Sequence, residues 1–318
     1  MDTSNRLENL PIALFAMVMG LSGLTLVWQK SAAVFGFSPI MGRGLLILTA
    51  SLFGVLLIAY GIKSIRYPGA VRGELNHPVK LSFFPTISIS LILFGTATRH
   101  AFPALSLGLW ATGTALHLLL TLFIINRWMH HDHFQVVHIN PAWFIPAVGN
   151  ILVPIAGMTH GYEAISWFFF SIGVIFWVIL LTIIFYRVIF HDPLPGRLLP
   201  TLFILVAPPA AGFIAYESLN GALDPFGRIL FNAGLFMTLL LASQIRRFAS
   251  LSFFLSFWAY SFPLAAMTIA TMVYQAASGE GWALMLSGVL MAVTTAVILW
   301  LALLTLRAAQ RGEICIPE

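Results

Sequence analysis

The sequence predicts an all-α integral membrane protein whose ten transmembrane helices form five helical hairpins. Of the 318 residues, 59% are hydrophobic and 8% are charged, whereas soluble domains carry about 25% charged residues. Apolar stretches of about twenty residues, long enough for a helix to cross the hydrocarbon core, recur from end to end. Since no polar stretch is long enough to fold separately, we expect one transmembrane domain over 1–318, with short termini at 1–9 and 308–318.

The predicted spans are apolar runs separated by polar or turn residues. The fifth and sixth runs almost touch, around His160 to Glu163. A count of nine is the alternative if one of the weaker runs is re-entrant. In chain order, the ten runs are 10–29, 43–62, 79–98, 102–126, 141–160, 164–186, 199–217, 227–245, 251–275 and 282–306.

The distribution of Lys and Arg predicts the orientation. The side that holds both termini and the connections from even to odd spans carries twelve Lys and Arg residues, against four on the opposite side, which are Lys30, Arg43, Arg99 and Arg228. By the positive-inside rule, both termini should be cytoplasmic, in a multi-pass protein of the cell inner (plasma) membrane. Because these basic residues are scattered singly at the ends of apolar runs, the net charge of +5 does not indicate nucleic-acid binding.

Prolines separate the odd-numbered spans from the even-numbered ones. The six prolines deep within predicted spans all fall in odd ones, at Pro85, Pro146, Pro154, Pro208, Pro209 and Pro263. A proline in a helix removes a backbone hydrogen bond and kinks the axis, and in lipid the freed carbonyl needs another partner. We therefore expect a quasi-five-fold arrangement, with an inner ring of five kinked odd helices around a central pore and an outer ring of five even helices.

The spacing of these prolines supports a repeated hairpin. Pro85, Pro146, Pro208 and Pro263 lie 61, 62 and 55 residues apart, and Gly20 occupies the corresponding place in the first span, 65 residues before Pro85. The alternative is that transmembrane prolines are common and their segregation is chance.

The predicted inner helices have neutral walls. No Asp, Glu, Lys or Arg lies near the centre of an odd span, although coupled pumps and transporters usually place ionisable groups at mid-membrane. A passive pore for weakly hydrated anions does not need them, because backbone dipoles and small residues ease desolvation without trapping the ion. The pattern therefore favours a passive pore over a tightly coupled transporter.

Four segments entering or within the odd spans resemble those of one family, the bacterial tellurite-resistance protein TehA with its relatives, the plant slow-type anion channels and fungal malate transporters. They are 76–85 (NHPVKLSFFP), 140–149 (NPAWFIPAVG), 207–210 (APPA) and 257–265 (FWAYSFPLA). The resemblance runs from about Leu10 to Arg307. It implies a homotrimer in membrane lipid, each protomer holding its own pore for small inorganic anions, with no cofactor.

The resemblance also implies a phenylalanine of the ninth helix that blocks the pore at mid-membrane. The matching residue is Phe262, directly before Pro263. The alternative is that Phe262 is one of 27 phenylalanines and only packs a helix interface. With this gate, the predicted pore-lining residues are Gly20, Phe84, Pro85, Pro146, Gly149, Pro208 and Pro263.

The predicted function is thus a passive, gated channel for small monovalent anions such as nitrate and chloride. Names used for relatives suggest the alternatives, a secondary transporter of C4-dicarboxylates or a tellurite-resistance exporter. A metalloenzyme would have to use the His130, His131, Asp132 and His133 cluster, because His and Asp can bind a transition metal. A solvated loop that titrates near neutrality is the simpler interpretation, so we expect neither a metal site nor an enzyme.

Overall fold

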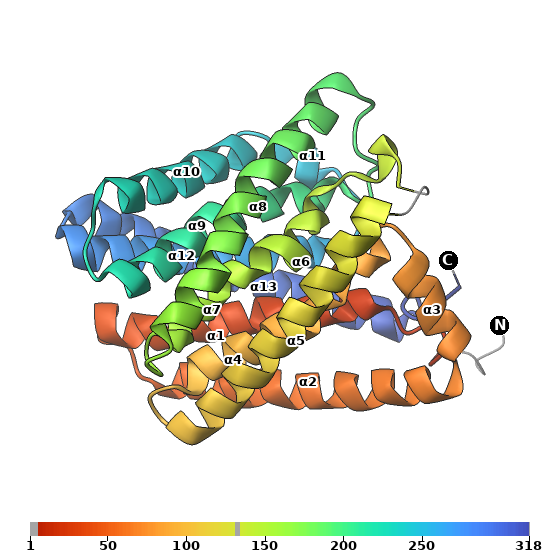
Figure 1. The fold of residues 1–318 in the computed structure, drawn as a ribbon, viewed down its shortest axis with the longest axis horizontal. Helices are drawn as coiled ribbons and strands as arrows, with labels where there is room; N and C mark the ends of the chain where they lie inside the picture. Colours follow the sequence, from red (N-terminus) through yellow and green to blue (C-terminus); the bar gives the residue numbers. More distant parts are fainter. Residues whose placement is uncertain (1–5, 131–133, 318) are drawn as a thin grey trace.

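The computed structural model describes residues 6–130 and 134–317, and within these ranges every regular element is helical. Five helical hairpins follow one another along the chain (Figure 1). The second members of the hairpins are long α-helices: α2 (Ile40–Arg66), α5 (Pro103–His130), α8 (Glu163–Phe190), α10 (Pro225–Ala242) and α13 (Gly281–Gln310).

The first members of the hairpins are composite, each joining a 3₁₀ helix to an α-helix. They are η2 (Ile12–Leu14) with α1 (Phe15–Phe35), η3 (Lys80–Phe83) with α4 (Pro85–Thr98), η7 (Leu199–Val206) with α9 (Ala207–Asn220), and η8 (Leu255–Tyr260) with α12 (Ser261–Ser278). The fifth span alternates between the two helix types through η5 (Pro141–Trp143), α6 (Phe144–Val148), η6 (Gly149–Leu152) and α7 (Val153–Gly157). Three shorter helices lie in connections: α3 (Pro68–Asn76), η4 (Val136–His138) and α11 (Ile245–Ala249).

The all-α membrane fold is confirmed. Among the described residues, nine helical segments are long and apolar enough to cross a membrane. The predicted fifth span is present as a shorter apolar segment, Pro141–Gly157. It is broken because Pro146 and Pro154 each lack the N–H that a continuous α-helix requires.

The inner and outer rings also differ in burial. In the most apolar window of each span, 78–94% of the residues are buried in the long odd segments, against 22–33% in the even ones. The odd segments close a ring, because α1 packs against α4 and α12, α9 packs against α12 and α7, and α4 packs against α7. Each even helix packs on the odd segment that precedes it, as α2 does on α1 and α13 on α12, and leaves its other side free for lipid.

The prolines mark the change from 3₁₀ to α-helix. Pro85 is the first residue of α4 and Pro154 the second residue of α7. Pro208 and Pro209 are the second and third residues of α9, and Pro263 is the third residue of α12. The first-turn N–H groups of an α-helix have no partner within that helix, so a proline there loses no bond. The expected kinks are therefore junctions between two helix types, and they break few hydrogen bonds.

Both termini lie at one end of the bundle, beside α3 (Figure 1). There Glu74 of α3 is buried and accepts hydrogen bonds from the backbone N–H of Ile12 (3.1 Å), the Tyr60 hydroxyl (2.6 Å) and Lys63 Nζ (3.0 Å). Lys63 Nζ also donates to the carbonyl of Leu10 (2.8 Å). This buried cluster joins α3 and α2 to the start of the first inner helix.

Candidate functional site

Three cavities follow one another inside the ring. A cavity of about 620 Å³ lies at the end opposite the termini, and because Lys30 and Arg99 line it we call it the cationic cavity. A central cavity of about 60 Å³ follows. A third, the tail-side cavity of about 510 Å³, is lined in part by the C-terminal residues Ile314 to Pro317.

Shared residues join the three cavities in series. Leu152, Ala211 and Phe262 line both the cationic and the central cavity. Phe83, Leu255 and Ser256 line both the central and the tail-side cavity. The series therefore runs from one end of the ring to the other, with its narrowest volume in the middle.

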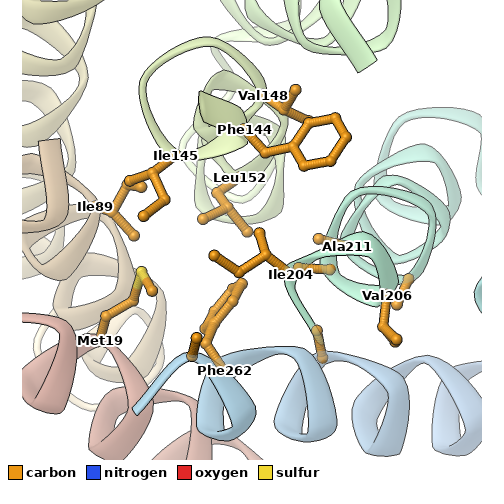
Figure 2. Close-up of a cluster of buried hydrophobic side chains, with 14 of the residues drawn as sticks. Met19, Ile89, Phe144, Ile145, Val148, Leu152, Ile204, Val206, Ala211 and Phe262 are labelled. Atoms are coloured by element: carbon orange, nitrogen blue, oxygen red, sulfur yellow. The ribbon is translucent and has the colours of Figure 1, made fainter. Parts of the chain in front are cut away.

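The central cavity is walled by apolar side chains from all five inner segments. Figure 2 shows Met19, Ile89, Leu152 and Ile204 arranged around the space into which Phe262 projects. None of the described residues that line it is charged, and Ser256 contributes its one side-chain hydroxyl. That hydroxyl has no hydrogen-bond partner within the described chain. At about 60 Å³ the space holds a few water molecules at most.

Phe262 lines both the central and the cationic cavity. Its side chain is 8% exposed, and it lies near the start of α12, directly before Pro263. Gly23 of α1 packs beside it, since a Cβ at Gly23 would lie 3.5 Å from Phe262 Cδ2 and 2.8 Å from Ala265 Cβ. A small residue at Gly23 thus lets α1 approach the helix that carries the ring.

The structure brings four of the eight predicted site residues to the central cavity: Phe262, Gly149, Pro208 and Pro263. Gly149 also has an outward contact, because a Cβ there would lie 2.8 Å from His117 Nε2 of α5.

The other four, Gly20, Phe84, Pro85 and Pro146, are buried but are not among the described residues that line the cavity. Phe84 instead packs edge-on against Tyr60 of α2, with ring centroids 6.2 Å apart, and its neighbour Phe83 faces the axis. At Gly20, a Cβ would lie 2.0 Å from Ser261 Oγ, so this glycine permits the close contact of α1 with α12.

Side chains of α5 bind the carbonyls that the broken fifth span exposes. Thr121 Oγ1 donates to the carbonyl of Pro146 (2.7 Å), and Trp110 Nε1 donates to that of Val153 (2.9 Å). Asn150 of the fifth span donates from Nδ2 to Thr121 Oγ1 (3.2 Å) and to the carbonyl of Ala147 (2.8 Å). An outer helix therefore compensates for the irregular backbone of an inner one, as burial in an apolar medium requires.

The cationic cavity brings together charged groups for which the sequence predicted only the side of the membrane. Lys30 comes from the last turns of α1, and Arg99 and His100 follow the end of α4. Burial lowers the pKa of the Arg99 guanidinium, which still stays cationic because its ordinary value is so high. Burial, and then the charge of Arg99, lower the pKa of the His100 imidazole. Glu217 is the one carboxylate among the described lining residues.

No group of three or more His, Cys, Asp or Glu side chains that could hold a metal ion lies in the described part of the chain. The histidine-rich segment weighed above as a metal site ends in residues 131–133, which lie outside the described residues.

Several known proteins are similar to this chain over most of its length. The chain is 28% identical over 271 residues to the S-type anion channel SLAH2 of Arabidopsis thaliana, covering 83% of this chain and 52% of SLAH2. It is 27% identical over 304 residues to SLAH3 of the same plant, covering 93% and 48%. The chain therefore spans about half the length of these two relatives.

A bacterial relative is matched over more of its own length. The chain is 25% identical over 260 residues to the tellurite resistance protein TehA homolog of Haemophilus influenzae, covering 81% of this chain and 79% of that protein. The SLAC1 family, described as voltage-dependent anion channels, matches residues 9–306. With its ring of buried inner helices and their lipid-facing partners, the chain is thus a multi-pass membrane protein that belongs to the SLAC1 family, a family of anion channels and not of enzymes.

Proposed function

We propose that this chain forms a gated, passive pore for small monovalent anions such as nitrate and chloride, with Phe262 as its gate. The observation that carries this proposal is the series of three cavities along the ring, whose narrow central member is apolar, uncharged and bounded by the Phe262 ring. Curated relatives named S-type anion channels support it.

The central cavity suits an ion that is easily dehydrated. An anion crossing a space of about 60 Å³ sheds most of its water, and the wall offers no fixed cation to hold it there. Conduction requires that binding be weak enough for the ion to leave. Permeation should therefore favour nitrate over the more strongly hydrated chloride, with the unpaired Ser256 hydroxyl as a neutral donor on the tail side of the constriction.

Opening requires the Phe262 ring to leave the axis. A side chain moved about 30° from a preferred rotamer costs about 0.5–1.5 kcal/mol, so a modest change in the surroundings suffices to shift the ring. The cationic cavity of about 620 Å³ beside the ring leaves room for that movement.

We extend the proposal to the assembly that the family resemblance implies and to the location and orientation that the basic residues indicate. The chain is a homotrimer in the cell inner (plasma) membrane, each protomer with its own pore, and both termini face the cytoplasm. The excess of basic residues on the termini side supports this orientation. The tail-side cavity then faces the cytoplasm and the cationic cavity faces outward.

The test is Phe262→Ala in reconstituted liposomes, with nitrate and chloride flux measured under an imposed potential. We expect flux to rise at least about tenfold, which corresponds to removing a barrier of about 1.4 kcal/mol. The matched control is Phe84→Ala, which removes an equally buried ring that packs on Tyr60 and should leave flux near the parent value. Equal flux in Phe262→Ala and the parent would refute the gate.

The same vesicles separate the channel from the alternatives. A passive pore gives an electrogenic anion current that a pH gradient does not drive. Proton-driven malate or tellurite transport by the parent, without a chloride or nitrate current, would instead identify a coupled transporter or exporter.

A further inference from the structure

The cationic cavity is lined by two positive side chains, Lys30 and Arg99, and neither forms an ion pair with a carboxylate in the described part of the chain. Lys30 has no hydrogen-bond or ion-pair partner within the described ranges, and it lies within electrostatic reach of Arg99. Two like charges brought together in a partly desolvated cavity repel each other.

Hydrogen bonds hold the Arg99 side chain in place and hold α1, which carries Lys30, beside the end of α4. Gln29, next to Lys30 on α1, donates from Nε2 to the carbonyl of Ala97 at the end of α4 (3.1 Å). Arg99 donates from Nη1 to the carbonyl of Thr96 (3.0 Å) and from Nε to His100 Nε2 (3.1 Å). The Gln29 contact holds α1 beside α4. Arg99 Nη2 has no hydrogen-bond partner among the described residues, so its N–H groups remain available to a ligand.

Glu217, the one carboxylate among the described lining residues, lies near the start of α10. Glu217 forms no ion pair with Lys30 or Arg99 in the described chain, and it lies instead beside the start of α10, where a Cβ at Gly227 would be 3.1 Å from Glu217 Oε1. It also interacts electrostatically with Asp224, which precedes α10. Glu217 therefore does not neutralise the pair, and the site between α1 and α4 keeps its positive charge.

We propose that Lys30 and Arg99 form a binding site that captures a small monovalent anion in the cationic cavity before it reaches Phe262. An anion between the two side chains offsets their repulsion and accepts charge-assisted hydrogen bonds from both. The cavity is continuous with the Phe262 ring, so a captured ion lies next to the constriction. This inference rests on the proposed function for its role in permeation but not for the binding itself.

The Lys30–Arg99 site should determine the anion concentration at which flux is half-maximal, and the gate should determine the maximal flux. In a Phe262→Ala background, Lys30→Gln should raise the half-saturating nitrate concentration for flux from the Lys30 side about fivefold, because a nearby unit charge contributes on that scale even when water screens it. Maximal flux should change little. Lys30→Arg in the same background keeps the charge and should leave the half-saturating nitrate concentration at the value of Phe262→Ala alone.

The matched control is Arg43→Gln. Arg43 lies at the same end of the bundle on α2 and is exposed, but it does not line the cavity. Its removal changes the net charge equally and should leave half-saturation unchanged. Equal shifts in Lys30→Gln and Arg43→Gln would show a general surface-charge effect and overturn the proposed site.

A binding measurement separates failure of the site from failure of the pore. Chloride binding to the detergent-solubilised protein, followed by ³⁵Cl line broadening, should be weakened in Lys30→Gln and in Arg99→Gln and kept in Arg43→Gln, whether or not the protein conducts. Size-exclusion chromatography checks that Arg99→Gln, which loses two hydrogen bonds, stays folded. Undiminished chloride broadening in both cavity variants would refute capture, even if Phe262→Ala conducts.

Discussion

The buried Lys63–Glu74 pair permits a quantitative test of how the terminal end of the bundle is held together. Lys63 is 2% and Glu74 7% exposed, and their charged atoms lie 3.0 Å apart. At an effective dielectric constant of about 20, two unit charges at that distance attract by about 5 kcal/mol, most of which offsets their desolvation. Replacing Glu74 by Ala leaves the Lys63 charge buried without its partner, which costs about 3–5 kcal/mol.

Glu74→Ala should lower the free energy of unfolding more than the removal of an exposed charge nearby. We expect Glu74→Ala to lower the free energy of unfolding by about 3–5 kcal/mol, measured by denaturant titration in mixed micelles with tryptophan fluorescence. The control is Arg66→Met, one turn further along α2 and exposed, which should change stability by no more than about 0.5 kcal/mol.

A double variant tests whether the stranded charge is the cause. Lys63→Met combined with Glu74→Leu removes both charges and keeps the volume, so it should recover much of the stability lost in Glu74→Ala. The reasoning fails if the double variant is as unstable as the sum of the two single ones, or if Glu74→Ala costs less than about 1 kcal/mol. Either result would assign the stability to packing rather than to charge pairing.

Two further predictions concern helix contact and pH. Gly20→Ala places a methyl 2.0 Å from Ser261 Oγ and should lower the free energy of unfolding by about 1–3 kcal/mol, measured by the same denaturant titration. The control Gly44→Ala adds a methyl in open space on α2 and should leave stability unchanged. If Gly20→Ala is as stable as the parent, the close contact between α1 and α12 is contradicted. Hydrogen bonds from the Gly227 N–H and the Tyr216 hydroxyl hold the pKa of the Asp224 carboxyl below its usual range, so its stabilising effect should be present above about pH 4 and lost as pH falls through the lowered value. The melting temperature of the parent should therefore exceed that of Asp224→Ala at pH 6, and this difference should shrink towards pH 3; a constant difference would refute the assignment.

The ring architecture could be predicted because its signals are local. Hydropathy over about twenty residues identifies a span, and prolines in alternate spans indicate which helices avoid lipid. The sequence was less informative about which side chains face the pore, because long-range packing decides their direction. The pattern at 83–85 predicts a phenylalanine on the pore wall, but the rotation of the 3₁₀ turn makes it Phe83 rather than Phe84.

Contacts between residues far apart in the sequence could not be predicted either, because they too depend on how the helices pack. Lys30 and Arg99 are 69 positions apart and, taken singly, each resembles an ordinary charge at a helix end; only the packing of α1 on α4 makes them neighbours. Gly20 fits the proline register, yet its short distance to Ser261 depends on how closely α1 approaches α12. Proline position is thus informative about helix class, whereas side-chain direction has to come from the structure.

The C-terminal residues that line the tail-side cavity matter for how this protein is handled in the laboratory. Ile314, Cys315, Ile316 and Pro317 all contribute to its wall, so an affinity tag or fluorescent protein fused at this end begins at the mouth of the cavity series. Flux recorded from such a fusion includes whatever the appended sequence obstructs. Cleaving the tag before reconstitution, and comparing cleaved with uncleaved protein in the same vesicles, separates the two contributions.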